Sequence, residues 1–304
     1  MRVAVRRSNG QRRPRLGLPL RLLLLALVVG LGAVSGLAAV GLLKRLPPRR
    51  VAGVPLAVTA AGAPEQPPVA APRPVYELGT HPLLSPGVPL APVTCALPEF
   101  GRSAGALTAY YQAAIGCLDA AWQPVLANAS LPFVPPILDV TGTVSTACGT
   151  RPPREQATAF YCGADHTLTM PRDRMLADVG SRASGHLAVL AHEYGHHVQS
   201  QSGILRAAQT EEKQHPKGSP AEQEMSRRVE LQANCFSGMF LAAVAGRGSI
   251  TKAFAKAGTD SFRNTVADGT HGTVANQVKW GTTGYRANHT AACNTFVVPG
   301  AEVG

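Results

Sequence analysis

The first 50 residues contain no acidic side chain, yet they carry all eleven of the excess positive charges in this 304-residue chain. From residue 51 onward, 18 basic and 18 acidic residues cancel. The net charge of +11 and the pI of about 9.8 therefore describe a basic tail on a neutral body. This distribution argues against a nucleic-acid-binding domain. It favours a topology signal, because basic residues concentrate on the cytoplasmic side of membrane segments.

Charged residues are also missing from the apolar run at 22–43, which is long enough to cross a bilayer as a helix. Seven arginines precede it, and Lys44 and Arg45 follow it. We predict a basic cytoplasmic tail at 1–21, one uncleaved transmembrane helix at 22–43 and an extracytoplasmic remainder. A cleaved signal peptide is the alternative, but its apolar region would be shorter and would precede a small-residue cleavage site. No cysteine follows the run closely, so we do not expect a lipoprotein.

Residues 44–92 lack hydrophobic periodicity and are rich in proline and alanine. Such a composition is typical of an extended linker. We therefore expect the folded domain to span residues 93–304.

No two cysteines are spaced as C-x-x-C, which argues against zinc ligation by cysteine. An even number on the exported side instead predicts three disulfides. The cysteines are Cys95, Cys117, Cys148, Cys162, Cys235 and Cys293. Fifteen pairings are possible. The preferred one joins the near neighbours 95–117 and 148–162 and leaves 235–293 as a long-range link.

Hydrophobic periodicity predicts a mainly helical domain with a small β element, an α+β fold. The predicted helices span 105–128, 184–202, 220–245, 250–257, 259–267 and 274–286. Strands are expected within 132–140 and at 166–170, a disulfide-closed loop or hairpin at 143–162, and a short helix or loop at 171–184. The polar stretch 206–219 is predicted to be a mobile loop.

The helix at 184–202 contains His192-Glu193-Tyr194-Gly195-His196, which matches the zinc-peptidase pattern H-E-x-x-H. Two histidines four residues apart lie one turn above the other, so both imidazoles can reach one Zn²⁺. Glu193 is rotated about 100° from His192, too far to be a ligand but close enough to reach a metal-bound water. Leu187, Leu190, Ala191, Tyr194 and Val198 recur at helical spacing and predict the core face of this helix.

A catalytic zinc site needs a third protein ligand. The extended histidine form of the motif fails, because Gln199 and Ser202 occupy its glycine and histidine positions. A glutamate from a later helix is the other form. The candidates are Glu211, Glu212, Glu222, Glu224 and Glu230. Glu230 is favoured because it lies in a largely apolar segment, where a carboxylate needs a partner. An ion pair with Arg227 or Arg228 is the alternative. One turn later, Asn234 could accept a hydrogen bond from a zinc histidine.

Five blocks of the chain resemble the neutral zinc metallopeptidases of bacteria, which are membrane-anchored proteins with a gluzincin-like site. They are Phe160-Tyr-Cys162 with Asp165, Ala191 to Gln199, Glu230 to Gly238, His271-Gly-Thr273 and Cys293 to Phe296. The resemblance covers roughly residues 93–296. It departs from the family pattern at Asn234 and Asn294, where aspartate is expected. Asn234 carries no charge, so it would raise the basicity of an imidazole less than aspartate would.

The resemblance implies a zincin-like domain that holds one Zn²⁺ per chain through His192, His196 and Glu230, with Glu193 as catalytic acid and base. We therefore expect a membrane-anchored peptidase, an endopeptidase, that acts on peptide or protein substrates and binds no nucleic acid. A second donor to the developing oxyanion is also expected. Its candidates are His271, Tyr285 and Tyr161, for each of which a structural role is the alternative. The competing function is a catalytically silent zinc-site protein that serves as an extracytoplasmic binding or scaffold module.

Overall fold

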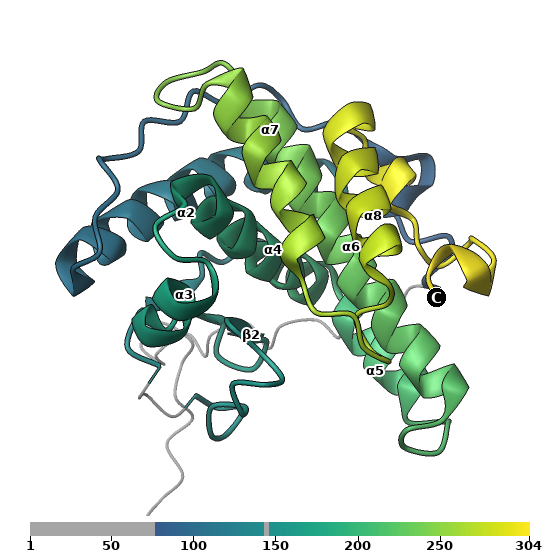
Figure 1. The fold of residues 1–304 in the computed structure, drawn as a ribbon. Coiled ribbons are helices and arrows are strands. Elements are labelled where there is room, and N and C mark those ends of the chain that lie inside the picture. Colours follow the sequence, from purple (N-terminus) through teal and green to yellow (C-terminus); the bar gives the residue numbers. More distant parts are fainter. Residues whose placement is uncertain (1–76, 143–145) are drawn as a thin grey trace, which may run out of the picture. The chain divides into compact units, whose positions relative to one another are not determined.

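The computed structural model describes residues 77–142 and 146–304, and the predicted tail and transmembrane helix at 1–43 lie outside these ranges. Within them, no helix combines the length and the apolarity that a membrane crossing requires. The domain is mainly helical (Figure 1) and contains one small mixed sheet, which confirms the prediction of a mainly helical fold with a small β element. The division of the whole chain into four segments stays a prediction.

Within the described residues, five helices of seven residues or more precede the segment around Gly246, and two follow it. They are α2 (Ala104–Asn128), α3 (Arg172–Asp178), α4 (Ala183–Ser202), α5 (Ile204–Glu212), α6 (Pro220–Val244), α7 (Lys252–Asp260) and α8 (Val274–Ala287). Shorter helical turns are η1 (Leu83–Gly87), η2 (Ser261–Asn264), η3 (Thr290–Cys293) and η4 (Gly300–Glu302). Ser103, Ser219, Thr251 and Thr273 begin four of the helices by accepting a backbone N–H with the side-chain oxygen.

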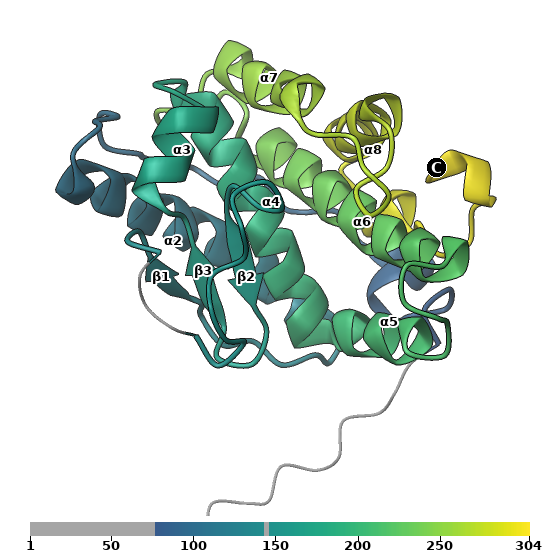
Figure 2. The same ribbon diagram turned by 60° about the horizontal axis from the view of Figure 1, so that its bottom comes forward.

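The sheet contains β1 (Ile137–Asp139), β2 (Phe160–Cys162) and β3 (Thr167–Thr169) in the order β1-β3-β2. β1 pairs with β3 in parallel, and β2 pairs with β3 antiparallel, so Leu168 lies between Leu138 and Tyr161. Figure 2 shows the three strands side by side. β2 and β3 contact α4, and the sheet therefore flanks the helix that carries the H-E-x-x-H motif.

Helix α4 runs through the core, and its predicted apolar face is buried throughout: Leu187, Leu190, Ala191, Tyr194 and Val198 are at most 2% exposed. It packs on α2, α6 and α7. Contact with α6 is close, because Gly195 faces Ala233 and the Ser237 hydroxyl donates to the carbonyl of Ala188 at 3.0 Å. α8 lies along α6 (Figure 1).

Three disulfides join the segments in the preferred pairing. They are Cys95–Cys117, Cys148–Cys162 and Cys235–Cys293. The first links the segment before α2 to α2 itself, the second closes the loop that ends in β2, and the third links α6 to η3. Each therefore connects an element of the core to a segment with little secondary structure of its own.

Two predicted boundaries within the domain were wrong. The stretch 206–219 was expected to be a loop, but α5 continues to Glu212, because Ile204 and Ala208, four residues apart, bury one helical face in an otherwise polar segment. The helices expected at 250–257 and 259–267 are one helix, α7, followed by the short turn η2. Residues 77–92 also differ from the expected linker, since Leu83, Leu84 and Leu90 are at most 1% exposed in the core.

Two fully buried histidines tie separate segments together as neutral side chains. His81 lies 3.1 Å from the carbonyl of Ser202 through Nε2, and its Nδ1 accepts the backbone N–H of Leu83. His186 lies 2.9 Å from the carbonyl of Gly180 through Nε2 and bonds the Tyr111 hydroxyl through Nδ1. Because a carbonyl only accepts, Nε2 carries the hydrogen in both rings. Burial lowers the pKa of both histidines.

Candidate metal centre

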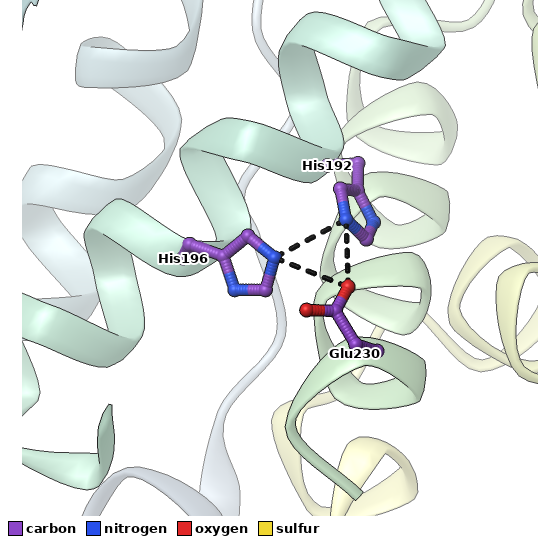
Figure 3. Close-up of side chains that lie close together, drawn as sticks. All are labelled: His192, His196 and Glu230. Carbon is purple, nitrogen blue, oxygen red and sulfur yellow. Dashed lines mark hydrogen bonds and ion pairs between the residues drawn. The ribbon is translucent and has the colours of Figure 1, made fainter. Parts of the chain in front are cut away.

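Helices α4 and α6 bring three side chains together where they cross. Nε2 of His192 and Nε2 of His196 lie 3.2 Å apart, and Oε2 of Glu230 lies 3.2 Å from the first and 3.3 Å from the second. Figure 3 shows both imidazoles on α4 and the carboxylate on α6 pointing toward one another. Within the described ranges, this is the only group of three or more histidine, cysteine, aspartate or glutamate side chains close enough together to hold one metal ion.

The alternative role for Glu230, an ion pair with a neighbouring arginine, is absent from the described residues. Arg228 pairs with Glu224 at 2.7 Å, and Arg227 donates to the carbonyl of Gly269 at 2.7 Å. Instead, Oε2 of Glu230 lies within 3.8 Å of the Nε2 atoms of three histidines: His192, His196 and His271. A half-buried carboxylate surrounded by imidazoles is a metal-ligand arrangement.

The electrostatics of the three side chains are strongly coupled. Burial by itself raises the pKa of Glu230, but His196 and His192 outweigh it and lower that pKa well below its usual value. Burial likewise opposes protonation of His196, yet Glu230 raises its pKa to about 9. A negative charge thus stabilises positive charge at the point where the ring nitrogens meet, and a divalent cation would take the place of the protons.

Both imidazoles have their far nitrogen bound by a side-chain oxygen. Nδ1 of His192 lies 2.8 Å from Oδ1 of Asn234, the contact expected for that residue, and Nδ1 of His196 lies 2.8 Å from Oε1 of Gln199. An amide oxygen only accepts, so each Nδ1 carries a hydrogen, and Nε2 is the nitrogen whose lone pair becomes free for a metal ion once its proton is lost. This is the protonation that a metal-binding imidazole requires.

Glu193 is 7% exposed, on the same helix as both histidines. Burial raises the pKa of its carboxyl group, and the charge of Glu230 adds to the increase while those of His192 and His196 oppose it. A raised pKa suits a carboxylate that must take a proton and later release it.

Of the three residues predicted as oxyanion donors, His271 is the one whose contacts reach the group. Its Nε2 lies 3.8 Å from Oε2 of Glu230, and its Nδ1 lies 2.9 and 3.0 Å from the two oxygens of Asp268. Asp268 also accepts the backbone N–H of His271 at 2.8 Å. Burial by itself raises the pKa of Asp268, but its hydrogen bonds outweigh burial and lower that pKa to about 2. Asp268 therefore stays a carboxylate and holds the His271 ring with Nε2 toward the site.

The two tyrosines have other surroundings. The hydroxyl of Tyr161 lies 3.0 Å from Nδ1 of His197 and 3.0 Å from Nδ1 of His166, on a different face of α4 from the metal-site histidines. Burial raises its pKa to about 12. Tyr285 lies on α8 and packs against the hydrophobic core.

Sequence reasoning missed Asp268 and gave Gln199 no role in the site. A signal existed for each. Asp268 precedes His271 by three residues, a spacing at which an aspartate can bind the backbone and ring of the residue that follows. Gln199 follows His196 by three residues on the same helix, a spacing at which two helical side chains can contact each other.

The model of one protein family, described as "Putative neutral zinc metallopeptidase", matches residues 101–296. The chain belongs to this family. The match includes α4, α6 and the loop that carries Asp268 and His271, so every residue of the candidate centre lies within it.

Relatives of the chain occur in mycobacteria and enterobacteria. It is 31% identical over 208 residues to the uncharacterized protein Rv2575 of Mycobacterium tuberculosis, covering 59% of this chain and 67% of that protein. It is 31% identical over 183 residues to the uncharacterized protein YpfJ of Escherichia coli, covering 53% of this chain and 61% of YpfJ. No solved structure matches the chain.

Proposed function

We propose that the protein is a membrane-anchored, zinc-dependent peptidase, an endopeptidase, that hydrolyses peptide bonds outside the cytoplasm. His192, His196 and Glu230 hold one Zn²⁺, and Glu193 is the general base. The observation that supports this most directly is the set of partners of Glu230: three histidines, and neither neighbouring arginine. Family membership supports the same reading.

The donor set fits zinc. Two neutral imidazoles and one carboxylate are a common catalytic zinc ligand set, which leaves a fourth position for water. Metal–ligand bonds of about 2.0–2.1 Å in a tetrahedral site place ligand atoms about 3.3 Å apart. The separations of 3.2, 3.2 and 3.3 Å among His192, His196 and Glu230 match that spacing. His271 lies beside this group, with its Nε2 3.8 Å from Oε2 of Glu230.

Zinc held by these three residues would lower the pKa of a water molecule and polarise the scissile carbonyl. Glu193, with its raised pKa, accepts the proton of the attacking water and delivers it to the leaving amine. Protonated on both nitrogens, His271 would donate from Nε2 to the carbonyl oxygen as negative charge develops there. Burial lowers the pKa of His271, but Glu230 and Asp268 outweigh burial and raise that pKa. Asp268 accepts from Nδ1 and keeps the ring in that orientation. Removal of Asp268 would therefore weaken the donor without removing it.

Location outside the cytoplasm is supported by the three disulfides, which persist in oxidising compartments. The charge distribution of residues 1–50 and the apolar run at 22–43 support the membrane anchor.

The test uses the full chain, purified in detergent, and measures bound zinc by elemental analysis and cleavage of a peptide library. We expect one zinc per chain, and cleavage that Glu193→Gln abolishes while zinc binding persists. The matched control is Glu155→Gln, which makes the same change at an exposed acid of the 146–159 loop and should leave cleavage intact.

Two other outcomes have definite meanings. Stoichiometric zinc without Glu193-dependent cleavage would refute the peptidase and favour the binding or scaffold module, for which the neutral Asn234 at the His192 ring is the supporting feature. Absence of zinc at neutral pH would refute both zinc functions.

A further inference from the structure

We propose that a chain of hydrogen bonds from the backbone carbonyl of Cys293, through the side chains of Gln232 and Gln199, fixes which nitrogen of His196 carries the proton. Gln199 and Gln232 are then positioning residues of the metal centre. This inference rests on the proposed function, because it treats His196 as a zinc ligand. It adds to that function the reason why the proton of the neutral His196 ring lies on Nδ1.

The contacts form one continuous path. Nε2 of Gln232 donates to the carbonyl of Cys293 at 3.1 Å. Nε2 of Gln199 donates to Oε1 of Gln232 at 3.0 Å. Nδ1 of His196 lies 2.8 Å from Oε1 of Gln199. The path crosses from η3 to α6 and then to α4, so it links three elements that are far apart in the sequence.

The path has one direction. A peptide carbonyl only accepts, so the amide group that faces Cys293 must be the NH₂ of Gln232. Its oxygen is thereby turned to Gln199 and requires a donor, the NH₂ of Gln199. That leaves the oxygen of Gln199 facing His196, and this oxygen can only accept. Nδ1 of His196 must therefore carry the hydrogen, and Nε2 is left with the lone pair that a metal ion needs.

Reversal of either amide is strongly disfavoured. The second hydrogen of Gln199 Nε2 is donated to the carbonyl of Val229 at 2.8 Å, so turning this amide would break two bonds and set its oxygen against another oxygen. Gln199 and Gln232 are both 0% exposed, and water cannot take over lost partners. A buried polar group without a partner is costly, because it has lost its hydrogen bonds to water and gained none in the protein.

The disulfide fixes the far end of the path. Cys235 lies three residues after Gln232 on α6 and is bonded to Cys293, with 5.5 Å between their Cα atoms. The Cys293 carbonyl and the Gln232 amide that donates to it are therefore held together by the disulfide.

The experiment measures the zinc affinity of the full chain by competition with a chelator, in three methionine variants. Methionine keeps the length of glutamine but neither donates strongly nor accepts strongly. We expect Gln199→Met to weaken zinc binding about 10–100-fold, the usual effect of losing a partner of a metal-bound histidine. Gln232→Met should weaken it in the same direction but less, because the oxygen of Gln199 remains.

Gln201→Met is the matched control. Gln201 is also a buried glutamine of α4, at 1% exposure, but its amide lies against His166, 3.4 Å away, and not against His196. Its zinc affinity should equal that of the wild type. Urea unfolding of each variant checks that it is folded.

The result that overturns the inference is a folded Gln199→Met or Gln232→Met with wild-type zinc affinity. If the wild type binds no zinc, the proposed function fails, and the inference is decided separately by histidine ¹⁵N resonances at alkaline pH, where imidazoles are neutral. His196 should then carry its proton on Nδ1 in the wild type. In Gln199→Met it should be a mixture of two forms, one with the proton on Nδ1 and one with the proton on Nε2. The same spectrum in both proteins would refute it.

Discussion

Gly195 lies at the contact between α4 and α6, the two helices of the candidate metal centre. It lies between His192 and His196 on α4 and faces Ala233 on α6. A Cβ atom at this position would lie 3.0 Å from the Cα, 3.1 Å from the Cβ and 3.1 Å from the carbonyl oxygen of Ala233. Ordinary contacts are longer, so Gly195→Ala requires the helices to separate by a few tenths of an ångström. Glu230, on α6, would then move away from both histidines.

The free-energy change combines two opposing contributions. Replacing a helical glycine by alanine stabilises a helix by about 0.5–1 kcal/mol. Overpacking at a tight contact costs about 1–3 kcal/mol. For Gly195→Ala we therefore expect a net loss of about 1 kcal/mol in the free energy of unfolding, or about 2–4 °C in Tm for a domain of this size. Zinc affinity should fall about tenfold, as for loss of a group that orients a ligand.

The assay combines urea unfolding with zinc competition, and Gly116→Ala is the control. A Cβ at Gly116 on α2 would meet no atom within 4 Å, so only the helical preference acts there. That variant should be more stable by about 0.5–1 kcal/mol, with unchanged zinc affinity. If Gly195→Ala is stabilised as much as Gly116→Ala and binds zinc as tightly as the wild type, the close approach of α4 and α6 does not limit the site.

Three further outcomes are expected. Removing zinc with a chelator should lower the free energy of unfolding by about 4 kcal/mol relative to zinc at about 1,000 times its Kd, and adding zinc back should restore it; a calorimetric Tm that zinc does not change would contradict the site. Acidification should destabilise the metal-free domain through His81 and His186, because their pKa values are lower in the folded state than the unfolded value of about 6.5. As the pH falls below about 6.5, the unfolded state therefore binds more protons than the folded state. Each histidine then lowers the free energy of unfolding by at most about 1.4 kcal/mol between pH 7.5 and 5.5. In urea unfolding, the stability of His81→Gln should fall less steeply with pH than that of the wild type, and equal slopes would show that His81 does not contribute to the acid destabilisation. Asp268→Asn should lower kcat about tenfold with little change in KM in steady-state peptide cleavage, since it loosens the donor His271 but removes no group that binds the ground state; an altered KM alone would assign Asp268 to substrate binding.

Local spacing and chemical need, both readable in the sequence, determined much of this protein. The positions of His192 and His196 follow from a periodicity of 3.6 residues, which any helix imposes without reference to the rest of the chain. Glu230 followed from the cost of a carboxylate in an apolar segment, and the structure places it 3.2 and 3.3 Å from the two rings. The pairing of the six cysteines also agreed, because near neighbours need little chain to be brought together.

Tertiary packing decided what depends on contacts between distant segments. α5 was missed because two buried residues, Ile204 and Ala208, outweigh a polar composition once a core is present to cover them. Among three oxyanion candidates, only the folded chain shows His271 at Glu230 and Tyr161 bound by His166 and His197. The path from Cys293 to His196 likewise joins residues almost a hundred positions apart. A sequence records which side chains can donate or accept, whereas the direction of each hydrogen bond depends on which groups the fold brings within 3 Å of one another.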